Sequence, residues 1–239
     1  MTGHPMKSFR ALSALLSYPT QDLKDAVPDI RALLVDEGLF GPRHLSGLDP
    51  LLSRLAGADI LDSQETYVLL FDRSRSLSLN LFEHVHGESR DRGGAMVDLL
   101  ETYRAAGFDL AGTELPDHLP VLLEFLSTQP VAEARAILQD AGAILVALAE
   151  RLTRRESLYA PVLTALVDFA QAEATGEEAA ALLAEPLDNP EDLAALDATY
   201  AEAQVVFGPD PNAGCPASRD LLARMDLRPA PNPNPLAAE

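Results

Sequence analysis

Three of the five histidines of the 239-residue chain lie between Tyr67 and Leu126, together with acidic and arginine side chains. Two short clusters stand out there: residues 83–92 read EHVHGESRDR, and residues 114–118 read ELPDH. Imidazole and carboxylate groups together can hold a metal ion, transfer protons or bind a charged partner. Any specific chemistry of this chain is therefore expected in these two clusters.

A metal site at the first cluster would need His84 and His86 to converge. Residues two apart point to different faces of a helix, and they converge only in a strand or a loop. A metal-binding histidine also needs a partner on its other ring nitrogen, which a sequence does not reveal. We predict no metal site here and interpret Glu83, His84 and His86 as candidate contacts to a partner.

Arginines flank the same cluster on both sides. Three glycines and two arginines between residues 87 and 94 suggest a phosphate cradle, although the spacing matches neither the P-loop nor the dinucleotide fingerprint. A helix start with Ser89 as N-cap explains the segment more simply. Both interpretations stay open, and so does a cofactor-binding module built on these arginines. The candidate anion or partner contacts are Arg73, Arg75, Glu83, His84, His86, Arg90 and Arg92.

The second cluster places Asp117 and His118 between Pro116 and Pro120, at the mouth of an apolar helix. Such rigid placement predicts a contact surface. A catalytic role would need a nucleophile or a metal, and the chain has no Gly-x-Ser-x-Gly elbow. We predict that the protein is not an enzyme. The alternative from another class is an all-helical metal-dependent phosphohydrolase using His84, His86, Asp117 and His118, although the usual His-Asp dipeptide is reversed here.

The amino-acid composition limits the classes of partner that the chain is expected to bind. The chain has 37 acidic residues against 18 Lys and Arg, a net charge of −19, which argues against nucleic-acid and anionic membrane binding. A single cysteine, Cys215, suits a reducing compartment. The N-terminal apolar run lacks a signal-peptide cleavage pattern, and no apolar segment reaches the roughly 20 residues that span a bilayer. We expect a cytoplasmic protein without membrane insertion.

The elements that carry the two clusters are expected to be helices, because the apolar residues are mainly Leu and Ala and aromatic residues reach only 5%. Residues 77–82 alternate Leu with Ser and Asn, but we predict a loop or helical turn because no partner strand is evident nearby. The predicted helices cover 6–17, 20–38 with Pro28 as a kink or a new start, a segment opening at Asp49-Pro50, a face formed by Tyr67, Leu70 and Phe71, 96–107, 119–126, one helix through 138–152, and 162–170.

The C-terminal third differs in charge and proline content. Residues 156–218 hold twelve acids and no Lys, Arg or His, so this stretch is either a docking surface for a basic partner or a solvated acidic face. Seven of the 18 prolines fall between residues 209 and 235. We predict one helical domain over residues 1–207 and a flexible Pro-rich tail over residues 208–239.

With these residues in place, the chain resembles the NarJ-type nitrate reductase molybdenum cofactor assembly chaperones, within the TorD-like redox enzyme maturation proteins. The resemblance is carried by YVLLFDRSRSLSLNLFEHVHGESRDRGGAMVDLLETY and ELPDHLPVLLEFLS. It implies an all-α single-domain bundle that binds the N-terminal peptide of the catalytic (alpha) subunit of respiratory nitrate reductase. The apoenzyme would be held for molybdenum cofactor insertion before membrane attachment, with no cofactor of the chaperone's own.

The resemblance also implies which residues bind the peptide. In the family, the E-x-PDH motif and the apolar helix before it line the peptide groove. Indirect contact with the machinery that delivers the molybdenum cofactor is implied as well. The positions that match here are Tyr67, Leu70, Phe71, Glu114, Asp117, His118 and Leu122.

Overall fold

The computed structural model describes residues 6–86, 90–110, 112–173, 177–184 and 189. All of them belong to the first of two units, residues 1–192 and 193–239. The predicted domain boundary at residue 207, the Pro-rich tail and Cys215 lie outside the described residues.

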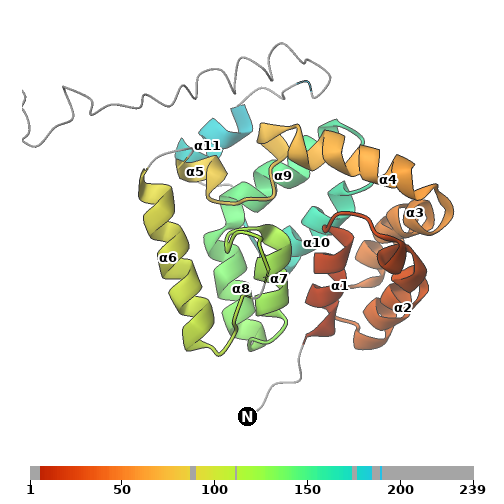
Figure 1. Cartoon of the computed structure of the whole chain (residues 1–239), viewed down its shortest axis with the longest axis horizontal. Helices are drawn as coiled ribbons and strands as arrows, with labels where there is room; N and C mark the ends of the chain where they lie inside the picture. The colour runs from red at the N-terminus through yellow and green to blue at the C-terminus, as the bar shows by residue number, and fades with distance from the viewer. Residues whose placement is uncertain (1–5, 87–89, 111, 174–176, 185–188, 190–239) are drawn as a thin grey trace, which may run out of the picture. The chain divides into compact units, whose positions relative to one another are not determined.

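The described part of the chain is helical and contains no named β-strand (Figure 1), which confirms the all-helical prediction. None of its helices is long and apolar enough to cross a membrane. The helices are α1 (Lys7–Leu15), α2 (Gln21–Glu37), α3 (Pro42–Gly57), α4 (Ile60–Tyr67), a π-helix (Val68–Asp72), a 3-10 turn (Arg75–Leu77), α5 (Glu83–His86), α6 (Arg90–Ala105), α7 (Leu119–Leu126), α8 (Val131–Asp140), α9 (Gly142–Arg154), α10 (Ala160–Ala170) and α11 (Glu177–Ala184).

Several helix ends follow directly from local sequence. The hydroxyl of Thr20 accepts a hydrogen bond from the Leu23 amide at 3.2 Å and caps α2, and Gly38 ends that helix with a left-handed φ of 63°. Pro28 lies inside this single helix and opens no new one. Helix α7 spans the predicted residues, with Pro120 in its first turn.

The start predicted for α3 at Asp49-Pro50 is wrong, because the helix begins at Pro42 and continues through Pro50. Proline usually marks a first turn, and the sequence offers two such prolines. The position of the apolar face determines which of the two prolines starts the helix. Leu48 is fully buried together with Leu51, so the core-facing stripe already exists before Pro50 and packing continues the helix across it.

The single helix predicted through residues 138–152 is also wrong, because the chain bends at Ala141 and forms α8 and α9. The apolar spacing continues across the bend, so periodicity alone could not reveal it. A Cβ atom built on Gly142 would lie 3.0 Å from the Cβ of Ala172. The glycine therefore allows the close approach of the segment that follows α10.

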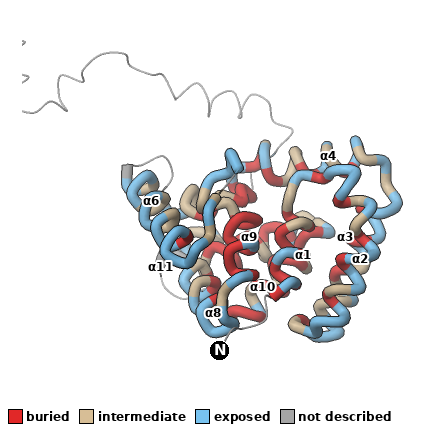
Figure 2. The backbone as a smooth tube through the Cα atoms, turned by 60° about the horizontal axis from the view of Figure 1, so that its bottom comes forward, coloured by how far each residue is buried: buried red, intermediate tan, exposed pale blue. Residues whose placement is uncertain are grey.

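Helices α1 and α10 form the centre of the fold. Helix α1 packs between α2 and α7, while α10 packs against α3, α8 and α9. Figure 2 shows that α9 and α10 are mostly buried, whereas α2 and α6 expose much of their length. Helices α1 and α2 are antiparallel: a carboxylate oxygen of Glu37 accepts a hydrogen bond from the Lys7 amide at 2.9 Å, and the other accepts from Ser8 at 2.6 Å.

Three groups of aromatic rings join elements that are distant in sequence, with neighbouring ring centroids 4.5–6.5 Å apart. Such edge-on and tilted contacts add to the stability that burial already provides. The groups are Phe9, Phe40 and Phe169; Tyr67, Phe71 and Tyr159; and Tyr103, Phe108 and Phe125.

Candidate functional site

The two clusters singled out in the sequence meet in space. Asn80 and His118 form an isolated antiparallel bridge, so the loop over residues 77–82 pairs with the N-terminus of α7. The Leu81 amide donates to the Asp117 carbonyl at 3.1 Å, and the Leu119 amide donates to the Leu79 carbonyl at 2.8 Å. The loop prediction is confirmed. Its partner lies 38 residues away along the chain, beyond the reach of local patterns.

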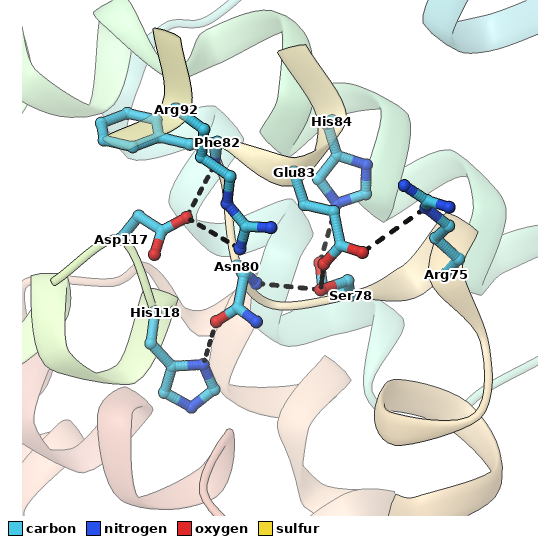
Figure 3. Close-up of polar contacts among 9 residues, drawn as sticks. All are labelled: Arg75, Ser78, Asn80, Phe82, Glu83, His84, Arg92, Asp117 and His118. Carbon is cyan, nitrogen blue, oxygen red and sulfur yellow. Dashed lines mark hydrogen bonds and ion pairs between the residues drawn. The ribbon is translucent and has the colours of Figure 1, made fainter. Parts of the chain in front are cut away.

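Asp117 is fully buried, so its predicted place on a contact surface is wrong. Its Oδ2 atom accepts a hydrogen bond from the Phe82 amide at 3.0 Å and lies 3.9 Å from Nη2 of Arg92 (Figure 3). Burial raises the pKa of the carboxyl group, and the Phe82 amide and the Arg92 guanidinium oppose that shift. Asp117 is therefore a buried side chain that holds the loop over residues 77–82 in place through the Phe82 amide.

His118 is half-buried beside this loop. Its Nδ1 atom lies 3.2 Å from Oδ1 of Asn80, as Figure 3 shows. Burial lowers the pKa of His118 below its ordinary value of 6.5, against the opposing effects of Glu114, Asp117 and Asp72. The lowered pKa favours the neutral imidazole at pH 7.

A pocket of about 340 Å³ opens beside His118. Its acidic side chains are Asp109, Glu114 and Glu124, and none of the described residues that line it is Lys or Arg. Its apolar side chains come from the segment after α6 and the first turn of α7. An amphipathic peptide with Lys or Arg beside apolar residues fits such a pocket. The full lining is Ser13, Ser17, Phe108, Asp109, Leu110, Gly112, Glu114, His118, Pro120, Val121 and Glu124.

The other residues expected in a peptide groove lie elsewhere. Tyr67 and Phe71 are buried against Tyr159, and the Tyr67 hydroxyl donates to the Leu16 carbonyl at 3.0 Å. Leu122 is also buried in the core. Leu70 lines a different pocket, between α3, α4 and the start of α10. The structure therefore brings Glu114 and His118 to one surface and uses the other five residues differently.

Four of the seven candidate anion or partner contacts form polar contacts around the loop over residues 77–82; they are Arg75, Glu83, His84 and Arg92. Nε of Arg75 lies 3.5 Å from Glu83, whose other oxygen accepts from the Ser78 hydroxyl at 2.7 Å. Nε2 of His84 lies 2.8 Å from the Ser78 carbonyl oxygen. Arg75 and Arg92 thus each face a carboxylate of the chain itself. Arg73 is half-buried, and the His86 and Arg90 side chains and Ser89 lie outside the described part.

The geometry of these residues does not assemble the phosphohydrolase site. His84 faces a backbone carbonyl, His118 faces an asparagine amide, and Asp117 holds a backbone amide. Within the described ranges, no group of three or more His, Cys, Asp or Glu side chains is placed to hold a metal ion.

Sequence reasoning missed several residues that shape this region. Asp109 and Glu124 line the acidic pocket, and Glu124 on the exposed face of α7 could have been found from its helical spacing to Pro120 and Val121. Arg151 is almost fully buried. Its guanidinium donates to carbonyl oxygens of the 3-10 turn and of α11, a helix that was not predicted.

Comparison with known proteins identifies relatives over most of the chain. The family model described as nitrate reductase delta subunit matches residues 22–165. The nitrate reductase molybdenum cofactor assembly chaperone NarJ of Escherichia coli K12 is 41% identical over 205 residues, covering 85% of this chain and 86% of the relative. The probable chaperone NarW of the same strain is 36% identical over 214 residues, covering 89% of each chain.

A solved structure agrees in fold. A protein from Archaeoglobus fulgidus described as a redox enzyme maturation protein superimposes with a TM-score of 0.52 at 24% identity, covering 72% of this chain and 96% of that chain. The relatives are named as assembly chaperones, which gives the phosphohydrolase hypothesis no support. The chain belongs to the nitrate reductase delta subunit family, the family of the NarJ-type molybdenum cofactor assembly chaperones.

Proposed function

We propose that this protein is a chaperone that binds the N-terminal segment of the cofactor-free catalytic subunit of a nitrate reductase. It keeps that subunit competent for molybdenum cofactor insertion until the enzyme attaches to the membrane. The chaperone acts in the cytoplasm, carries no cofactor and catalyses no reaction. Its contact with the cofactor delivery machinery is indirect, through the bound subunit.

The observation that carries this proposal is the acidic pocket beside His118. Asp109, Glu114 and Glu124 give it negative charge, and Phe108 and Val121 provide apolar surface. A peptide with a few apolar anchors gains about 1.5–3 kcal/mol for each, and ordering the peptide costs about 2–5 kcal/mol. Attraction between the carboxylates and Lys or Arg of the peptide then determines whether the affinity is high enough for the chaperone role.

Four of the other residues of the implied groove, Tyr67, Phe71, Asp117 and Leu122, are buried and do not reach a bound peptide themselves. Asp117 holds the loop over residues 77–82 against α7. Tyr67 and Phe71 pack below the surface, where they fix the π-helix that carries Asp72. In this proposal Glu114 and His118 contact the peptide, while Asp117, Tyr67, Phe71 and Leu122 position the surface.

Salt should weaken peptide binding. The screening length falls from about 10 Å at 0.1 M salt to about 3 Å at 1 M, so the attraction between carboxylates and a basic peptide is largely lost. We expect the affinity for a synthetic N-terminal peptide of the catalytic subunit to fall about tenfold over this range, or about 1.4 kcal/mol. Calorimetric titration at both salt concentrations measures it. Equal or tighter binding at 1 M salt would remove charge attraction from the proposed mechanism.

A further inference from the structure

One buried arginine links helix α11 to the 3-10 turn that leads into the loop over residues 77–82. Arg151 is 1% exposed and lies on α9, the helix against which α11 packs (Figure 1). Its Nη1 atom donates a hydrogen bond to the Ser76 carbonyl at 2.7 Å, and Nη2 donates to the Leu182 carbonyl. These acceptors lie 75 and 31 residues away along the chain. A single side chain therefore fixes α11 and the turn relative to each other.

The 3-10 turn determines where the loop begins. The Ser78 amide donates to the Arg75 carbonyl at 3.2 Å, and the Ser78 hydroxyl accepts from the Asn80 amide at 3.2 Å. Asn80 pairs with His118, which lines the acidic pocket, and Figure 3 shows these side chains in sequence. A continuous path of backbone and hydrogen bonds thus leads from α11 to the pocket.

Packing alone does not require an arginine at this position. Leu148 and Leu152 lie on the same face of α9 and are fully buried as well. Burying a guanidinium costs free energy that burying leucine or methionine does not, unless its N–H groups find acceptors. The forked guanidinium can, however, donate to two carbonyls at once in a fixed geometry. The presence of arginine here therefore indicates that the relative position of the two carbonyls matters.

We infer that Arg151 is a positioning residue for peptide binding. It transmits the docking of α11 to the loop over residues 77–82 and so holds His118 in place at the acidic pocket. Because its guanidinium is buried, Arg151 does not touch the peptide itself. The inference rests on the proposed function for the identity of the ligand. A purely structural arginine would change the stability of the protein but leave the affinity of the folded chain unchanged.

The first arm of the test loosens α11 without changing the pocket or the core. Glycine lowers the stability of an exposed helix position relative to alanine, and Ala180 and Ala181 are exposed on α11. The variant is Ala180→Gly/Ala181→Gly. Its control is Ala132→Gly/Ala136→Gly, the same change at two exposed positions of α8.

The second arm removes the guanidinium. Arg151→Met takes away both donors, and its control, Arg154→Met, removes an exposed arginine of the same helix. By calorimetric titration, Arg151→Met and the α11 glycine variant should each bind the N-terminal peptide about fivefold more weakly, at a temperature where circular dichroism shows every variant folded. Both controls should match the wild type. If α11 acts through Arg151, the two changes combined should weaken binding no more than Arg151→Met alone.

Hydrogen exchange provides a measurement that needs no peptide. The Leu81 amide donates to the Asp117 carbonyl, so it should exchange faster in the α11 glycine variant than in its control, while amides of α1 stay unchanged. Unchanged exchange of Leu81 would overturn the inference. Wild-type affinity in the α11 glycine variant would overturn it too, and this result stands even if Arg151→Met fails to fold. Additive losses in the combined variant would also contradict it. Failure of the peptide to bind the wild-type chain would instead contradict the proposed function, and the exchange of Leu81 would still test the link from α11 to the loop.

Discussion

Replacing Arg151 with methionine is expected to lower the free energy of unfolding by about 2–4 kcal/mol, because two carbonyl oxygens lose a charged donor at a cost of about 1–3 kcal/mol each. Nη1 of Arg151 donates to the Ser76 carbonyl at 2.7 Å, and Nη2 donates to the Leu182 carbonyl. Methionine fills similar space but donates no hydrogen bond, so both carbonyls lose a donor. Urea unfolding of the variant measures the loss.

The control for this change lies three residues along the same helix. Arg154 is exposed and pairs with Glu150, so Arg154→Met should cost less than about 1 kcal/mol. Hydrogen exchange should also quicken in α11 of the Arg151 variant, because Leu182 loses its link to α9. Equal stability of the two variants would show that Arg151 does not hold these elements together.

Replacing Asp117 with alanine is expected to cost about 2–3 kcal/mol of stability, because the buried Phe82 contact and the charge facing Arg92 are both lost. Asparagine keeps an oxygen that accepts from the Phe82 amide, so Asp117→Asn should retain most of the stability. Thermal and urea unfolding of both variants compare them. An alanine variant as stable as wild type would contradict the structural role.

Comparison with the asparagine variant also tests how the stability of the wild type depends on pH. Burial raises the folded-state pKa of Asp117 above its ordinary value of 3.8. The stability associated with its protonated form is present in full below about pH 3.8 and is lost as the pH rises through the raised folded-state pKa. The wild type should therefore lose stability relative to Asp117→Asn as the pH rises from about 4 through the raised folded-state pKa. A constant difference over that range would show that the pKa is not raised.

Local sequence was sufficient for helices whose ends carry their own signals. Thr20 and Gly38 bound α2, and Pro116 before α7 and Pro120 in its first turn mark the start of that helix. Local sequence was insufficient where tertiary packing determines where a helix starts or ends. The buried Leu48 extends α3 to the N-terminal side of Pro50, and the contact between Gly142 and Ala172 accompanies the bend between α8 and α9.

The two sequence clusters do meet in space, but the sequence did not show which of their side chains are exposed. Glu114 and His118 of the ELPDH motif line the pocket, but Asp117 was expected on a contact surface because it lies between Pro116 and Pro120, and the structure buries it. The burial of Asp117 depends on the bridge between Asn80 and His118, which joins segments 38 residues apart along the chain. Asp109 belongs to the pocket through the chain path after α6, which no local pattern specifies.

The most direct test of the central claim is a calorimetric titration of the catalytic subunit's N-terminal peptide into Glu114→Gln/Glu124→Gln at low salt. The control, Glu65→Gln/Glu101→Gln, removes the same charge from exposed positions of α4 and α6. If the acidic pocket binds the peptide, the pocket variant should bind about 5–30-fold more weakly, or about 1–2 kcal/mol, and the control should match the wild type. Equal affinities for the two variants would contradict the claim that this pocket is the peptide site.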